Sequence, residues 1–276
     1  MNTARMLVDG VATTQIQAND RGLLYGDGVF ETILFVHGRA PLWTRHVARL
    51  HEACARLALP VPDTAQLERE AAQVCAGLAR AVVRVTLTRG SGERGYAPPR
   101  PAQSRCIVSA TVAAEINPDW YRRGIRVRWC DTRLAAQPRL AGIKHLNRLE
   151  NVLARAEWND ADIAEGLLRD EADNVIGATA ANVFAVIDGQ LRTPALYHCG
   201  VAGVMRAQVL AWRTEAQVQV VATDELMRAS EVFLTNAVRG VLPVRELDGA
   251  TWSVGPVAAE LISRCRACGL LPQETA

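Results

Sequence analysis

The feature that most constrains the fold is a set of short segments in which apolar and polar residues alternate, placed among helical patterns. Such alternation is typical of half-buried strands. The segments that favour strands are 82–89, 106–112, 125–130, 217–223 and 231–236. Residues 183–192 predict two further strands joined by a turn at Asp188-Gly189. Strands mixed with scattered helices indicate an α+β fold.

Apolar residues spaced by three or four positions predict four helices. The clearest covers residues 45–58, with Thr44 as its N-cap. The others are expected at about 146–158, 202–214 and 255–266. Together with the strands, they give each half of the chain enough elements for a core of its own.

A boundary between two domains is expected near 113–124, where a proline and a glycine separate two strand-rich halves. This interpretation gives a smaller N-terminal α/β domain over 1–113 and an interdomain linker at 114–124. A larger C-terminal α/β domain follows over 125–276. Ligands often bind in the cleft between two such lobes.

The composition is that of a packed globular protein, with 49% hydrophobic and 22% charged residues. A net charge of +2 gives no reason to expect nucleic acid or a membrane surface as a partner. The first residues lack the apolar core of a signal peptide, and no segment reaches the length of a membrane span. Seven cysteines without dense spacing indicate reduced thiols, so we expect a cytoplasmic protein.

Two motifs resemble functional sites without their required context. Residues 90–95 satisfy GxGxxG, but a dinucleotide site needs a helix directly afterwards, and the prolines at 98, 99 and 101 exclude one. Cys265 and Cys268 form a CxxC pair with no second pair nearby to complete a tetrahedral metal site. We therefore expect neither a dinucleotide nor a bound metal.

Lys144 is the only lysine in the chain, so the 31 basic residues comprise 30 arginines and one lysine. Arginine replaces lysine where a solvated charge suffices, but it cannot lose a proton and attack a carbonyl. Lys144 lies at an expected loop-to-helix junction between Ile143 and Leu146, where partial burial lowers the pKa of an amine. The single lysine therefore indicates chemistry at a carbonyl carbon, although chance survival of a surface lysine explains the count equally well.

The surrounding sequence decides between these interpretations. AGIKHLNRLENVLARAE at 141–157 resembles the lysine motif of the fold-type-IV pyridoxal-phosphate enzymes, and within them it is most similar to the aminodeoxychorismate lyases. Further matching motifs follow the family's order along nearly the whole chain: NDRGLLYGDGVFET at 19–32, HVARL at 46–50, RGSGERGY at 89–96, ANVF at 181–184, GVAGVMR at 200–206 and LTNA at 234–237.

The resemblance implies a two-lobed α+β fold of the D-amino-acid aminotransferase type, with pyridoxal 5'-phosphate between the lobes and two chains in a homodimer. It also implies a lyase of folate biosynthesis that converts 4-amino-4-deoxychorismate to 4-aminobenzoate and pyruvate. Lys144 would hold the cofactor covalently and then move the proton from the amine-bearing carbon of the substrate.

The resemblance also assigns the remaining site residues. Arg49 would bind the cofactor phosphate, because a planar guanidinium suits that group. Further phosphate contacts would come from residues at a helix start and after a strand, namely Gly203, Val204, Met205, Asn236 and Ala237. Arg94, Tyr25 and Phe30 would face the substrate. A solvated helix face for Arg49 and a simple β-turn at 236–237 are the alternatives.

One position departs from the family pattern. The family places a glutamate five residues before the asparagine of the ANVF-type motif, where it pairs with the pyridine nitrogen, and this chain has Gly177 there. Losing that carboxylate weakens the cofactor as an electron sink. Transamination would suffer more than an elimination that creates an aromatic ring, so Gly177 favours the lyase as a hypothesis.

Three alternatives stay open at this point. A D-amino-acid or branched-chain aminotransferase would share the fold and Lys144. A protein that binds the cofactor with little catalysis is consistent with Gly177. An α+β domain of unrelated function is the third.

Overall fold

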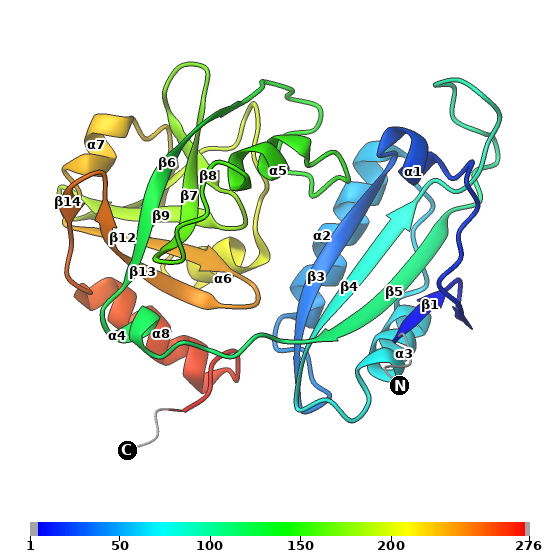
Figure 1. The fold of residues 1–276 in the computed structure, drawn as a ribbon, viewed down its shortest axis with the longest axis horizontal. Helices are drawn as coiled ribbons and strands as arrows, with labels where there is room; N and C mark the ends of the chain where they lie inside the picture. The colour runs from blue at the N-terminus through cyan, green and yellow to red at the C-terminus, as the bar shows by residue number, and fades with distance from the viewer. Residues whose placement is uncertain (1–4, 274–276) are drawn as a thin grey trace. The chain divides into compact units, whose positions relative to one another are not determined.

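The computed structural model describes residues 5–273, which form two compact units (Figure 1). The first unit comprises the chain up to Ala114 together with Lys144–Asn147. The second comprises Glu115–Ile143 and the chain from Arg148 onward. Residues 115–124 of the segment expected as a linker contain a short helix, α4 (Asp119–Arg122), and belong to the second unit.

The first unit is built on a five-stranded antiparallel sheet of order β2-β1-β5-β4-β3, with β3 at one edge. Its strands are β1 (Met6–Val8), β2 (Val11–Ala12), β3 (Gly28–Val36), β4 (Arg80–Thr88) and β5 (Arg105–Val112). Its helices are α1 (Arg21–Tyr25), α2 (Trp43–Leu57) and α3 (Thr64–Cys75). Helix α2 packs on β3, and α3 packs mainly on β5.

The alternation of apolar and polar residues that predicted β4 and β5 reflects alternate burial of their side chains. Along β4, every second side chain from Ala81 to Leu87 is buried against the helices. Helix α2 also agrees with its predicted span, but Thr44 is not its N-cap. The helix begins two residues earlier than predicted, at Trp43, and its N-cap Leu42 makes no side-chain hydrogen bond. Helix α3 escaped the sequence analysis, although Asp63 caps it by accepting hydrogen bonds from two backbone N–H groups.

The second unit contains one nine-stranded sheet of order β11-β10-β9-β12-β13-β6-β7-β8, with β14 added beside β13. Strand β8 returns to contact β9, so the sheet curls into a partly closed barrel. The strands are β6 (Ile125–Leu134), β7 (Ile163–Asp170), β8 (Val175–Ala178), β9 (Asn182–Ile187), β10 (Gln190–Pro194), β11 (Gln217–Gln219), β12 (Glu231–Asn236), β13 (Gly240–Leu247) and β14 (Ala250–Thr251).

Four more helices complete this unit: α5 (Leu149–Arg155), α6 (Val204–Trp212), α7 (Thr223–Met227) and α8 (Pro256–Ala267). The predicted hairpin is confirmed as β9-β10, with positive φ angles of 50° at Asp188 and 74° at Gly189. The strand expected at 217–223 is correct only for β11. Thr223 already belongs to α7, where Glu225 accepts a hydrogen bond from the Ala222 N–H at 2.9 Å.

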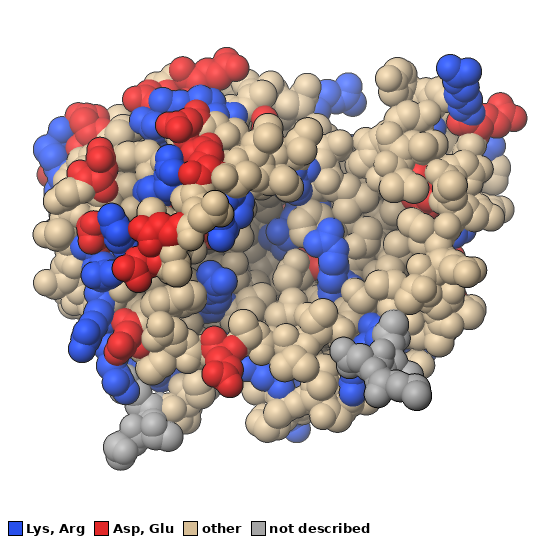
Figure 2. All heavy atoms as spheres, viewed as in Figure 1, with Lys and Arg blue, Asp and Glu red and all other residues tan. Residues whose placement is uncertain are grey.

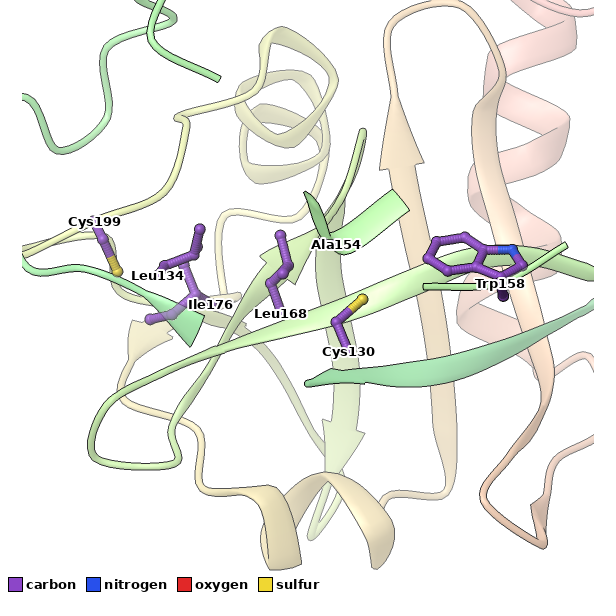
Figure 3. Packing of buried hydrophobic residues seen from close by; sticks show 7 residues of the cluster. All are labelled: Cys130, Leu134, Ala154, Trp158, Leu168, Ile176 and Cys199. Atoms are coloured by element: carbon purple, nitrogen blue, oxygen red, sulfur yellow. The ribbon is translucent and has the colours of Figure 1, made fainter. Parts of the chain in front are cut away.

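A buried cluster includes residues of β6, β7, β8 and α5, and Figure 3 shows its side chains. Its members are Cys130, Leu134, Ala154, Trp158, Leu168, Ile176 and Cys199. Gly166 borders the same cluster, and a Cβ there would lie 2.4 Å from the Cys130 sulfur. The cluster therefore requires glycine on this part of β7 and fixes the position of the strand against its neighbours.

Helix α5 differs most from its prediction. The expected helix at 146–158 is shorter, and its apolar residues are not all buried. Leu149 and Leu153 are 69% and 56% exposed, while Leu146 belongs to the first unit. The apolar residues of α5 therefore have helical spacing, but they are not buried as the apolar face of a helix usually is.

Arginine and acidic side chains alternate on the second unit in the face shown in Figure 2. Several of them form ion pairs, such as Arg126 with Asp160 and Glu246. Within residues 5–273, no helix combines the length and the apolar character that a membrane crossing requires.

Candidate active site

Residues 144–146 lie along the edge strand of the first unit. The N–H of Phe30 donates to the carbonyl of Lys144 at 3.0 Å, and the N–H of Leu146 donates to the carbonyl of Gly28 at 3.0 Å. A β-bridge between Val29 and His145 completes the pairing. Lys144 is therefore held by strand-like hydrogen bonds beside β3, and α5 begins only five residues later, at Leu149.

The Lys144 ammonium lies over the ring of Phe30. Its Nζ is 4.3 Å from the ring centroid, and the Arg84 guanidinium carbon is 4.1 Å from the same centroid. Phe30 itself is buried. An aromatic face attracts a cation, so this contact helps to position the Lys144 side chain.

A buried group of three charged or titratable residues lies in the same unit. Glu31 accepts hydrogen bonds from Arg49 at 2.8 Å (Nε) and 2.5 Å (Nη2), and its Oε2 is 2.6 Å from Nδ1 of His46. Glu31 and His46 are almost fully buried, and Arg49 is largely so. The carboxylate therefore holds one edge of the Arg49 guanidinium in a fixed orientation.

Burial and charge act in opposite directions within this group. Burial alone would raise the pKa of Glu31, but hydrogen bonds from His46 and Arg49 outweigh it and lower that pKa. Burial lowers the pKa of His46, and the positive charges of Arg49 and Lys144 act in the same direction. His46 is therefore neutral at physiological pH and donates from Nδ1 to the ionised Glu31.

Arg21 anchors the loop that carries Arg94. Its guanidinium donates to the carbonyls of Gly95 (2.9 Å), Tyr96 (3.0 Å) and Ala97 (3.2 Å). Asp27 holds Arg21 from the other side at 2.8 Å. Tyr25 and Arg94 were both expected to face the substrate. Tyr25 ends α1, and Arg94 lies in the loop that Arg21 anchors.

The hydroxyl of Tyr25 accepts a hydrogen bond from the Gly95 N–H at 3.3 Å, and its ring packs against Tyr96. Arg94 is exposed, in the same loop. Tyr25 thus helps to hold the loop, and Arg94 presents a charge at its surface.

Arg21→Ala should weaken substrate binding more than turnover, because it releases three backbone carbonyls of the Arg94 loop at once. We expect KM to rise about tenfold, corresponding to roughly 1.4 kcal/mol, with a smaller change in kcat. Limited proteolysis should cut the loop faster in this variant. An unchanged KM with an unchanged cleavage pattern would show that the loop needs no such anchor.

The second unit gathers the other predicted residues around Asn182. Gly203 precedes helix α6, and its N–H donates to Oδ1 of Asn182 at 3.1 Å. The Nδ2 of Asn182 donates to the carbonyl of Val201 at 2.8 Å. A Cβ at Gly203 would lie only 2.0 Å from Asn182 Oδ1, so this contact requires glycine.

Val204 and Met205 open α6 with buried side chains, so only their backbone N–H groups are available to a ligand. No side chain caps this helix end, and its first turn has no acidic residue. Such a terminus carries partial positive charge and suits an anion.

Asn182 is also the cross-strand partner of Thr235 on β12, directly before Asn236 and Ala237. The side chain of Asn236 builds the turn that follows. Its Nδ2 donates to the Ala180 carbonyl at 2.5 Å, and its Oδ1 accepts from the Val238 N–H at 2.8 Å. Its contribution to a ligand would therefore come from the backbone.

Residues 28–247 match the amino-transferase class IV family. An aminodeoxychorismate lyase from Vibrio harveyi is 35% identical over 86% of this chain and 89% of its own length. The crystal structure of 4-amino-4-deoxychorismate lyase from Pseudomonas aeruginosa has a TM-score of 0.92 and 45% identity, covering 96% of this chain and all of that one.

Enzymes with other activities share this fold. The branched-chain amino acid aminotransferase of Escherichia coli has a TM-score of 0.82, covers 95% of this chain and 93% of its own, and is 23% identical. The chain therefore belongs to the class IV aminotransferase family, and the fold-type-IV architecture predicted from sequence is confirmed.

The donor groups present fit the cofactor of this family. In the second unit, the uncapped start of α6 suits a phosphate. In the first unit, the guanidinium of Arg49 is a group of the kind that binds phosphate. Thr235 adds a second observation, because its buried Oγ1 has no hydrogen-bond partner among residues 5–273. A buried hydroxyl without a partner is costly, and a ligand oxygen would satisfy it. No cluster able to hold a metal ion occurs among the same residues.

Four residues of this arrangement escaped the sequence analysis as site candidates: Arg21, Glu31, His46 and Asn182. All lie inside motifs that carry the family resemblance, and that was the only available signal. Arg21, Glu31 and His46 contact partners 6 to 76 residues away in the chain, and the side chain of Asn182 bonds to partners 19 and 21 residues away.

Proposed function

We propose that this chain is a pyridoxal-phosphate-dependent lyase that converts 4-amino-4-deoxychorismate to 4-aminobenzoate and pyruvate. The observation that carries the proposal is the likeness to the Pseudomonas aeruginosa lyase, at 45% identity over 96% of the chain. Three branched-chain aminotransferase structures with the same fold are 20–24% identical. The one lysine in the chain lies beside β3, where it is positioned over Phe30.

Each candidate residue then has a role. Arg49 and the N–H groups of Val204 and Met205 hold the phosphate, supported by Gly203 and by the backbone of Asn236 and Ala237. When bound, pyridoxal phosphate supplies an electron-withdrawing ring that stabilises negative charge at the carbon losing a proton. Arg94 pairs with a substrate carboxylate, and Tyr25 and Phe30 border the substrate.

Lys144 moves the protons of the reaction. Its Nζ takes one proton from the amine-bearing ring carbon and returns one to the methylene carbon of the departing enolpyruvyl group. The ring carbon–oxygen bond breaks between these events, and the ring becomes aromatic. The substrate divides into 4-aminobenzoate and pyruvate with no other reactant.

The test supplies cofactor-loaded protein with 4-amino-4-deoxychorismate and follows both products. We expect 4-aminobenzoate and pyruvate in equal amounts. Steady transfer of an amino group from a D- or branched-chain amino acid to a keto acid, without these products, would assign the chain to the aminotransferases instead. Absence of both activities from protein that binds the cofactor would indicate a non-catalytic binder.

We propose in addition that two copies form a homodimer through α5. Leu149, Val152 and Leu153 follow helical spacing and are 69%, 60% and 56% exposed. A contiguous apolar stripe of this kind commonly marks an interface between subunits.

Leu153→Glu should shift the protein from dimer to monomer, because it places a charge in the centre of that stripe. Sedimentation velocity over a range of concentrations measures the change, and we expect the dissociation constant to rise at least about 100-fold. Val112→Glu, at an apolar residue on β5 that is 71% exposed, is the matched control. Equal dissociation constants for both variants would place the interface elsewhere.

A cytoplasmic location is also part of the proposal. All seven cysteines are unpaired, and five of them are buried. Unpaired thiols are typical of proteins in reducing compartments.

A further inference from the structure

Gly177 leaves the ring nitrogen of the cofactor without the carboxylate that the family pattern places at that position. Three nearby acidic residues do not replace it. Asp170 is used by the β7-β8 turn, where it accepts from the N–H groups of Ala172 and Asn174. Asp173 pairs with arginines at the surface, and Glu171 is exposed.

Glu165, on the neighbouring strand β7, is the buried carboxylate of this region, with only 6% of its surface exposed. Its Oε1 accepts hydrogen bonds from the hydroxyl of Thr179 and, at 3.0 Å, from the N–H of Gly166. The backbone of Ala180 also acts on it. The carboxyl group is thus directed at the turn 178–181, which follows β8.

Position 177 borders the same turn. A Cβ on Gly177 would lie 3.1 Å from the carbonyl oxygen of Ala181 and meet no other atom within 4 Å. The turn leads directly into Asn182, and its Ala180 carbonyl accepts from the Asn236 side chain. Glu165 and position 177 therefore approach, from adjacent strands, one turn that is part of the proposed cofactor site.

The raised pKa of Glu165 suits a carboxyl group that shares a proton with a ring nitrogen. Burial raises its pKa, against the lowering effects of the Thr179 and Gly166 hydrogen bonds and the charge of Arg239. A buried carboxyl group can pass its proton to a basic ring nitrogen and remain as the paired carboxylate. One O–H bond breaks and one N–H bond forms, and the net charge of the site is unchanged.

We propose that Glu165 is the carboxylate that pairs with the pyridine nitrogen of the bound cofactor, in place of a glutamate at position 177. The inference rests on the proposed function, because it requires that the chain bind pyridoxal phosphate. It is an alternative to the hypothesis that Gly177 weakens the electron sink, because Glu165 on the adjacent strand would supply the carboxylate.

The experiment reads the ring nitrogen directly. Protein is loaded with pyridoxal phosphate carrying ¹⁵N in the ring, and the ¹⁵N resonance reports whether that nitrogen is protonated. We expect a protonated nitrogen in the wild type and a neutral one in Glu165→Gln, with cofactor affinity reduced about tenfold. Adding Gly177→Glu to Glu165→Gln should restore the protonated signal, since a side chain at 177 requires only a small shift of Ala181.

Two controls separate this role from a structural one. Glu231 is equally buried at 6% and accepts hydrogen bonds from the N–H groups of Val257 and Ala258, so Glu231→Gln should lower stability without changing the ¹⁵N signal. Glu165→Asp serves if Glu165→Gln does not fold, and its shorter side chain should give a partly neutral nitrogen. The same protonated signal in wild type and either Glu165 variant overturns the inference. Failure of the wild type to bind pyridoxal phosphate overturns the proposed function as well.

Discussion

Lys144→Ala should abolish both the covalent attachment of the cofactor and the release of 4-aminobenzoate. We expect kcat to fall by at least about 1,000-fold, since one amine serves as the point of attachment and as the proton carrier. Because Lys144 is the only lysine, borohydride reduction of the loaded wild type should fix the cofactor to a single peptide, which mass spectrometry can identify. The alanine variant should bind cofactor weakly and carry none after reduction.

Lys144→Arg is the matched control for charge. It keeps a cation next to the Phe30 ring, where Nζ lies 4.3 Å from the centroid, but a guanidinium stays protonated and cannot act as a nucleophile. Equal inactivity of both variants, with thermal unfolding close to that of the wild type, would assign the effect to chemistry. Substantial turnover by either variant would refute the role given to Lys144.

The sequence could predict the fold class because its strongest signals are local. The alternation in β4 and the turn at Asp188-Gly189 depend on neighbours within a few residues. The family resemblance supplied Lys144 and Arg49, and the structure shows how they are held. The sequence could not show that residues 144–146 pair with β3, because that pairing joins residues more than 110 positions apart in the chain.

The parts that sequence missed depend on partners far apart in the chain. Helix α5 had the spacing of an amphipathic helix, yet Leu149 and Leu153 are exposed, because periodicity alone does not identify what covers a face. Gly177 revealed a missing carboxylate, but only the pairing of β7 with β8 shows that Glu165 approaches the same turn. Local sequence patterns therefore identify the helices and strands. Only the contacts between strands show which residue could take the place of a missing carboxylate on another strand.

Glu31→Gln should have the second largest effect, because it removes the charge that holds Arg49 and His46. Replacing one member of a buried ionic group costs about 3 kcal/mol, and we expect a loss of this order in the free energy of unfolding. Affinity for pyridoxal phosphate should fall about 100-fold, whereas affinity for pyridoxal, which lacks the phosphate, should change little. Glu52→Gln, an exposed position on α2, is the control for loss of a negative charge. Equal losses for both ligands would show that Glu31 does not act through Arg49.

The same group makes stability depend on pH in a defined direction. Folding lowers the pKa of His46 below its ordinary 6.5 and that of Glu31 below its ordinary 4.5. A pKa lowered by folding contributes stability that is present above the unfolded value and is lost as pH falls towards the folded value. The free energy of unfolding should therefore decline below about pH 6.5 and decline further below about pH 4.5. His46→Gln should remove the first decline, because glutamine can still donate to Glu31 but does not titrate. If the decline between pH 6.5 and 4.5 persisted in that variant, another group would be its source, since His46 is the member of the group that titrates in this range.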